Sequence, residues 1–181
     1  MMVFVVDQVG SAEYLLPLFL ERKETGSVNP VVFGNYLAVE FLGRNGIPCN
    51  PTSGMDGAAV NRIISEYHPE RVILSTAGTR EEQLFLDACL VQGVSCTQYI
   101  DQWGTDQERF RRQLERRDLS QAARSTDILF IDKDGSATLE NLGIPGERIA
   151  IIGHPWIESQ SSSNVAEPSA STVVLLTQPV S

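Results

Sequence analysis

Short runs of β-branched and other apolar residues alternate with longer amphipathic segments along the chain. This alternation is typical of successive βα units, which build a mainly parallel sheet with helices on both faces. Several of the runs are apolar with little alternation, as expected of strands that are covered on both sides. The pattern predicts an α/β fold, a Rossmann-like three-layer domain of six to seven strands, at 3–6, 31–33, 47–50, 71–74, 95–100, 128–131 and 148–152.

Capping and stop signals place helices between these strands. Ser11 is predicted to cap the first helix, and Asn45-Gly46 is a typical end for a helix that begins near Asn35. A third helix is predicted from Asp56 to Tyr67. Thr79-Arg80-Glu81-Glu82 has the Thr-x-x-Glu form of a capping box and predicts a fourth, and 136–142 predicts a short last helix.

The composition excludes several classes of protein. A net charge of -9 argues against a general nucleic-acid binder, which needs a broad basic face. The three cysteines lack C-x-x-C spacing, so neither a disulfide framework nor a zinc knuckle is indicated. The first apolar run is too short for a signal peptide, and no run of about 18 apolar residues follows. We expect a cytoplasmic protein that needs no cofactor.

Ligands of parallel α/β sheets bind beyond the carboxyl ends of the strands, so the residues after each strand are candidates. Gln8, Gly10 and Ser11 follow the first strand and enter a helix, whose free N–H groups suit an anion. A tight turn with a capping serine explains them equally. Ser75 and Thr76 follow the fourth strand and suit a phosphate or a sugar hydroxyl, although a simple N-cap loop is the favoured interpretation.

The loop after the fifth predicted strand is the strongest candidate for chemistry. Exposure of the Trp103 side chain to water is unfavourable, so we expect it either to stack on a ligand or to pack over the edge of the sheet. Asp101 suits an acid/base role or a bond to a sugar hydroxyl, and capping of the next helix is the alternative. His154 has no second histidine or carboxylate at metal-ligand spacing, so we expect no bound metal.

A long helical pattern between Asp106 and Arg124 carries six arginines among acidic residues. A solvated surface helix with internal ion pairs explains it. Peripheral contact with a membrane, or with an acidic partner, is the sharper alternative.

The composition changes after the last predicted strand. We expect the Rossmann-like domain to span residues 1–157 and a Ser, Asn, Ala, Glu and Pro linker to span 158–170. An apolar strand and a Thr-Gln-Pro loop follow within 171–181, which predicts the first strand of a truncated second domain.

The second half of the chain resembles a known family. Asp101-x-Trp103, the arginine-rich helix, the run 125–132, Leu142-Gly143-Ile144-Pro145-x-x-Arg148-Ile149 and Gly153-His154-Pro155 are similar to the N-terminal half of GT-B glycosyltransferases. Bacterial surface-polysaccharide transferases and UDP-N-acetylglucosamine 2-epimerases are the nearest look-alikes.

The resemblance implies an acceptor-side domain of a glycosyltransferase that is inactive alone. Its partners would be a nucleotide-sugar donor, held mainly by the second domain, and a sugar or lipid-linked acceptor. Gln8, Gly10, Ser11, Asp101 and Trp103 would face the cleft between domains, and His154 would lie near the hinge. A non-enzymatic α/β module for ligand binding or protein interaction is the alternative.

Overall fold

A computed structural model describes residues 1–25, 30–75, 79–100, 126–130, 133–141 and 143–154. These residues form one seven-stranded sheet in the order β3-β2-β1-β4-β5-β6-β7, and all neighbouring strands are parallel. The predicted fold class is therefore confirmed. The strands are β1 (Met2–Val6), β2 (Val31–Gly34), β3 (Asn50–Pro51), β4 (Arg71–Ser75), β5 (Ser95–Tyr99), β6 (Thr126–Phe130) and β7 (Ile149–Ile151).

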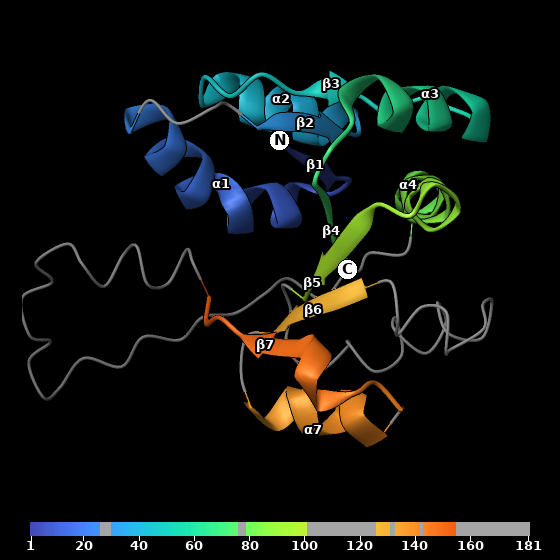
Figure 1. The fold of residues 1–181 in the computed structure, drawn as a ribbon. Helices are drawn as coiled ribbons and strands as arrows, with labels where there is room; N and C mark the ends of the chain where they lie inside the picture. The colour runs from blue at the N-terminus through green and yellow to red at the C-terminus, as the bar shows by residue number, and fades with distance from the viewer. Residues whose placement is uncertain (26–29, 76–78, 101–125, 131–132, 142, 155–181) are drawn as a thin grey trace, which may run out of the picture.

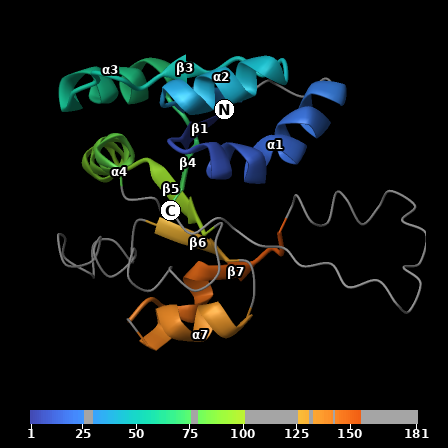
Figure 2. The same ribbon diagram turned by 180° about the vertical axis from the view of Figure 1, so that it is seen from behind.

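Alternate residues of β1 point into two separate cores, because successive strand side chains face opposite sides of a sheet. Phe4 and Val6 pack with α1 and α2, whereas Val3 and Val5 pack with α3 and α4. Figures 1 and 2 show α1 and α4 on opposite sides of the strands. The helices are α1 (Val9–Glu24), α2 (Tyr36–Arg44), α3 (Gly57–Tyr67), α4 (Arg80–Gln92), α7 (Lys133–Asn141) and the short η1 (Gly146–Arg148).

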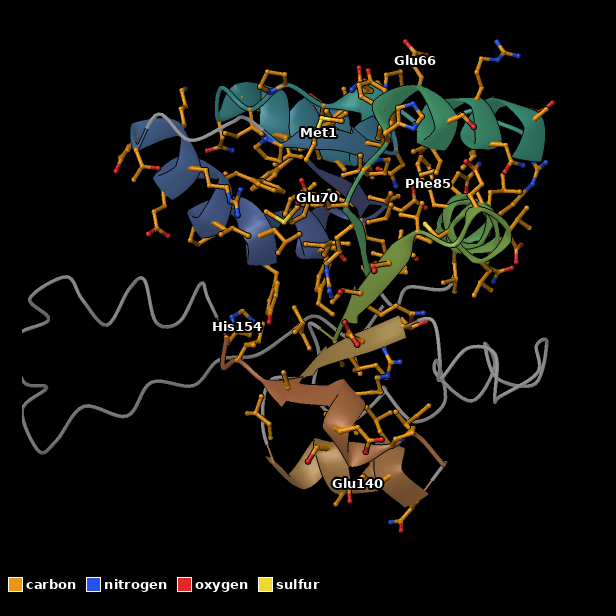
Figure 3. All side chains as sticks on the ribbon, viewed as in Figure 1. Met1, Glu66, Glu70, Phe85, Glu140 and His154 are labelled. Atoms are coloured by element: carbon orange, nitrogen blue, oxygen red, sulfur yellow. The ribbon has the colours of Figure 1, made fainter. Side chains whose placement is uncertain are left out.

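Aromatic side chains fill much of the core on the α3 and α4 side. Phe85 of α4 is fully buried, and its ring centroid lies 5.4 Å from that of Phe33 in β2. Figure 3 shows Phe85 directed from α4 toward the sheet. Burial of a side chain of this size contributes about 1.5–3 kcal/mol, so this contact fixes α4 firmly on the strands.

Most of the predicted helix signals are confirmed. Asn35 and Asp56 cap α2 and α3 through their side chains, and Thr79 forms the expected capping box with Glu82. Gly93 ends α4 in the left-handed conformation that favours glycine.

Two helix starts differ from the prediction. Helix α1 begins at Val9 with Gln8 at the N-cap position, so Ser11 lies inside the helix, buried, and does not cap it. Helix α7 begins at Lys133, three residues before the predicted start at Ser136. Apolar contacts favour the longer α1: Ala12, Tyr14 and the following apolar residues are buried in register with it.

The strand order reverses between β1 and β4. Strands β2 and β3 extend the sheet from β1 in one direction, and β4 to β7 extend it in the other. In open α/β sheets the crevice at this reversal, outside the carboxyl ends of the strands, is where ligands bind. The ends of β1 and β4 are therefore the place to look for a site.

No helix in the described ranges is long and apolar enough to span a membrane.

Candidate functional site

Polar residues are buried where β1 ends. Asp7 follows β1 directly and is only 4% exposed. Its carboxylate accepts a hydrogen bond from the hydroxyl of Thr52, at 3.3 Å, and another from the side chain of Thr79. Its main-chain carbonyl accepts a hydrogen bond from the amide of Asn35. Asp7 thus contacts the starts of α2 and α4 and the segment after β3.

Burial raises the pKa of Asp7 above its ordinary value of 3.8. The hydrogen bond from Thr79 lowers the pKa, the negative charge of Glu81 raises it, and the hydrogen bond from Thr52 lowers it, but the net direction is upward. A buried carboxyl with a perturbed pKa at the strand-order reversal is typical of functional sites.

A second buried carboxylate lies where β4 ends. Glu82 is 2% exposed and accepts hydrogen bonds from the hydroxyl of Ser75 and from the main-chain N–H of Thr79. The hydroxyl of Thr79 in turn accepts a hydrogen bond from the N–H of Glu82, at 3.3 Å. Thr79 therefore links the two acidic residues, and the N-terminal end of α4 favours their negative charge.

A hollow of about 200 Å³ opens at the first turns of α1, lined by Gly10, Glu13, Tyr14 and His154. His154 follows β7 and lies edge-on to Tyr14, with ring centroids 4.8 Å apart. In Figure 3 His154 lies at the end of the β7 segment, next to α1. A Cβ atom added at Gly10 would meet nothing within 4 Å, so the space in front of this glycine is open.

Tyr14 lines this hollow and a second one, and it contacts the segment that follows β7. Its hydroxyl donates a hydrogen bond to the carbonyl of Gly153, at 3.2 Å. Its ring also lines a larger, mostly apolar hollow of about 380 Å³ along α1, together with Tyr99 and Ile152. Aromatic, carboxylate and imidazole groups around a small hollow can hold a sugar ring through its apolar face and its hydroxyls.

The structure brings together only some of the residues expected from the sequence. Gly10 and His154, 144 positions apart, line the same hollow. Ser11 is buried, and its carbonyl accepts a hydrogen bond from Tyr99. Ser75 is buried and donates to Glu82, so its hydroxyl serves the network at the end of β4. Gln8 is exposed at the N-cap of α1.

Three expected site residues, Thr76, Asp101 and Trp103, lie outside the described residues, as does the arginine-rich segment 106–124. The boundary at residue 157, the linker 158–170 and the strand expected within 171–181 lie outside them too.

Sequence reasoning missed three contributors: Asp7, Glu13 and Tyr14. Asp7 had a usable signal, because an acidic residue directly after an apolar strand is placed at the carboxyl edge. Tyr14 and Glu13 had only the helical spacing from Gly10, at positions i+4 and i+3, which places all three on one face of α1. Without the strand order, nothing in the sequence indicated that this face would meet His154.

Within the described residues, no group of three or more His, Cys, Asp or Glu side chains is placed to hold a metal ion. His68, the other histidine, ends α3 in a left-handed conformation with φ 43°.

No model of a protein family matches the chain, and no curated protein matches its sequence. Solved structures do match. The UDP-N-acetylglucosamine 2-epimerase of Neisseria meningitidis, bound to UDP-N-acetylglucosamine, aligns with a TM-score of 0.64 at 14% identity, over 89% of this chain and 49% of that one. The MnaA protein of S. aureus, in complex with UDP, aligns with a TM-score of 0.64 at 13% identity, over 94% of this chain and 49% of that one.

A candidate UDP-N-acetylglucosamine 2-epimerase from Listeria monocytogenes aligns with a TM-score of 0.60 at 16% identity, over 88% of this chain and 46% of that one. The chain shares its fold with part of these proteins. It spans about half of the length of each. At these identities the similarity concerns the fold alone, and it agrees with the Rossmann-like α/β fold predicted from the sequence.

Proposed function

We propose that this chain forms one half of a nucleotide-sugar-processing protein and that the hollow at the start of α1 receives the sugar. The observation that carries the proposal is the position of this hollow. Gly10, Glu13, Tyr14 and His154 line it at the start of the helix that follows β1, beside the reversal of strand order. Two of the proteins with a similar fold were solved with UDP or UDP-N-acetylglucosamine, which supports this class of ligand.

Two reactions fit this class of protein. The segment from Gly143 to Gly153 and Asp101-x-Trp103 are similar to both glycosyltransferases and 2-epimerases, and transfer of the sugar to an acceptor is the first candidate reaction. The similar structures are those of 2-epimerases, which favours inversion at C2 of the sugar. In either case Asp101 remains our proposed acid/base residue and Trp103 our proposed sugar-stacking residue, because both belong to the few residues that follow β5 in the sequence.

Binding is tested first, with the whole gene product, so that any further part of the protein is present, labelled with ¹⁵N and titrated with UDP-N-acetylglucosamine and, separately, with UDP. We expect the sugar nucleotide to shift the amide signals of Gly10, Glu13 and His154, and UDP to shift them less. Absence of shifts at these residues at millimolar ligand would contradict a sugar site here.

A matched pair of substitutions tests the location. Gly10→Leu places a large side chain at the lining of the hollow, and nothing lies within 4 Å of a Cβ atom at this position. Gly43→Leu makes the same change at a glycine of α2 that has equally open surroundings and does not line the hollow. We expect Gly10→Leu to weaken binding at least tenfold and Gly43→Leu to leave it unchanged. Equal affinities for the two variants would place the ligand elsewhere.

The reaction is tested with the gene product isolated from its own cells, so that any further part of the protein is present. The product is incubated with UDP-N-acetylglucosamine, with and without cell-envelope acceptors, and analysed by ¹H NMR. Formation of the C2 epimer supports epimerisation, and release of UDP that depends on the acceptor supports transfer. Binding without either product would favour the ligand-binding module.

A further inference from the structure

Asp7 is held in place from several elements at once. Its carboxylate receives hydrogen bonds from Thr52, after β3, and from Thr79, the N-cap of α4. Its carbonyl receives one from Asn35, the N-cap of α2. Helix α1 starts at Val9, two residues further along the chain. The side chain and the main-chain carbonyl of Asp7 therefore join the end of β1 to the residues that follow β2 and β3 and to the start of α4. These segments lie at the edge of the sheet where ligands of α/β proteins bind.

Hydrogen bonds to an ionised carboxylate are about twice as strong as those between neutral groups. Both hydroxyls that face the Asp7 carboxylate are donors when it is ionised, since an ionised carboxylate has no proton and can only accept. Loss of the charge on Asp7 would weaken both bonds together. The same proton would relieve the cost of burying a charge that is 4% exposed. Protonation of Asp7 therefore weakens the two hydrogen bonds while it lowers the cost of burying the side chain.

We propose that Asp7 is the positioning residue of this edge of the sheet, and that in its ionised form it holds the segment after β3 and the start of α4 against the end of β1. Protonation weakens the hydrogen bonds from Thr52 and Thr79 and so loosens both residues. The consequence for ligand binding rests on the proposed function, because α1 carries Gly10, Glu13 and Tyr14 and begins beside Asp7. The positioning itself does not depend on that function.

The charged groups around Asp7 allow its pKa to be changed without altering its hydrogen bonds. From α4, Glu81 faces it with a like charge and raises its pKa, and the buried Glu82 is linked to it through Thr79. The segment after β3 contributes Thr52 and the start of α2 contributes Asn35, both uncharged, and the first turn of α1 has no acidic residue. Substitution of Glu81 can therefore change the pKa of Asp7 without removing a hydrogen bond to it among the described contacts.

The experiment follows the Asp7 side chain by its ¹³Cγ signal during a pH titration, together with the methyl signals of Thr52 and Thr79. We expect all three to change with one midpoint above pH 3.8, the ordinary value. Glu81→Gln removes the like charge and lowers this common midpoint by a fraction of a pH unit, with the limiting shifts unchanged. Glu66→Gln is the matched control, an exposed residue at the far end of α3, and leaves the midpoint where it was (Figure 3).

Asp7→Asn provides the second arm, because its neutral amide has the shape of the protonated acid. We expect Thr52 and Thr79 to show the low-pH shifts of the native protein at every pH. Should Asp7→Asn fail to fold, the comparison of Glu81→Gln with Glu66→Gln decides alone. Threonine signals that do not follow Asp7, or a common midpoint that Glu81→Gln leaves unchanged, would overturn the proposal.

The affinity for UDP-N-acetylglucosamine distinguishes this inference from the proposed function. If the native protein binds, we expect binding to weaken several-fold as the pH falls through the Asp7 midpoint, and Asp7→Asn to bind weakly at all pH values. Binding that ignores this midpoint would overturn the role in ligand binding. If the native protein binds no sugar nucleotide at any pH, the proposed function fails, and the threonine signals still decide whether Asp7 positions the edge.

Discussion

Tyr14 stacks on Tyr99, with ring centroids 5.2 Å apart and ring planes only 6° from parallel. Tyr14 belongs to α1 and Tyr99 ends β5, so the pair joins the helix that follows β1 to a strand on the other side of the strand-order reversal. Each hydroxyl donates to a main-chain carbonyl of another element, Tyr14 to Gly153 and Tyr99 to Ser11. The stacking and the two hydrogen bonds therefore hold Tyr14, which lines the hollow at the start of α1, in a fixed position.

The Tyr14→Phe substitution tests this anchor. The ring and its stacking stay, but the hydrogen bond to Gly153 is lost, so we expect the free energy of unfolding to fall by about 0.5–1.5 kcal/mol. The neighbouring ring signals of His154 should also broaden or shift in NMR spectra. Tyr36→Phe is the control, because Tyr36 is 71% exposed and should tolerate the change. Equal stabilities of the two variants in urea unfolding would show that the bond to Gly153 is not significant.

The hydroxyl of Thr79 has two roles, as cap of α4 and as donor to Asp7. Thr79→Ala should lower the free energy of unfolding by about 0.5–2 kcal/mol, whereas Thr79→Ser keeps the hydroxyl and should cost much less. The alanine variant should also raise the pKa of Asp7 further, because the largest effect that lowers this pKa is removed. Urea unfolding and the ¹³Cγ titration measure the two effects. An alanine variant as stable as the serine variant would rule out a significant cap.

Asp127 in β6 binds Arg71 of β4, at 2.6 Å, and Arg148, at 2.9 Å. Burial alone would raise the pKa of Asp127, but the hydrogen bonds and charges of the two arginines outweigh it and hold this pKa below 3.8. A carboxyl with a lowered pKa stabilises the folded state above its unfolded pKa, and this contribution is lost as the pH falls through the folded value.

The Asp127→Asn substitution should therefore cost about 1 kcal/mol at pH 6, since all three side chains are 34–40% exposed and solvent screens them. The difference from the native protein should shrink as the pH falls below about 4. Urea unfolding at several pH values measures it, with Glu40→Gln, which breaks the exposed pair with Arg44, as control. A difference that is constant down to pH 2 would contradict the ion-pair explanation.

Gly34 in β2 lies where β1 and β2 approach closely. A Cβ atom added there would lie 2.7 Å from the main-chain oxygen of Val6, and two paired strands cannot separate at little cost. We expect Gly34→Ala to destabilise the protein by about 1–3 kcal/mol. Gly43→Ala has open surroundings within α2 and should instead add about 0.5–1 kcal/mol. Thermal unfolding compares them, and two variants of equal stability would contradict the close approach.

Local signals in the sequence were sufficient for the fold. The apolar runs predicted six of the strands, whereas the third, expected at 47–50, lies at Asn50–Pro51. Asn35, Asp56 and Thr79 marked helix starts because each satisfies main-chain N–H groups within its own turn. Ser11 was wrong as a cap because the helix begins two residues earlier, at Val9, and Ser11 is buried inside it. Here tertiary packing outweighed a local preference.

The candidate site could be predicted only in part. Gly10 and His154 were named from their positions after strands, and the structure places them in one hollow. Their proximity depends on which strands are neighbours in the sheet. The order of the strands in a parallel sheet cannot be predicted from the local sequence of each strand. The burial of Asp7 depends on Thr52 and Thr79, 45 and 72 residues further along the chain, for the same reason.

The central position of β1 in the sheet has a consequence for synthesis of the protein. Its pairing with β2 is complete only after residue 34, and its pairing with β4 only after residue 75. At 5–20 residues per second, the run Val3-Phe4-Val5-Val6 leaves the ribosome roughly 3–14 s before the strand that covers its second edge. During that interval a strand that is buried in the folded protein is an exposed apolar segment with an unpaired edge. Such a segment is prone to aggregation and is a binding site for a chaperone.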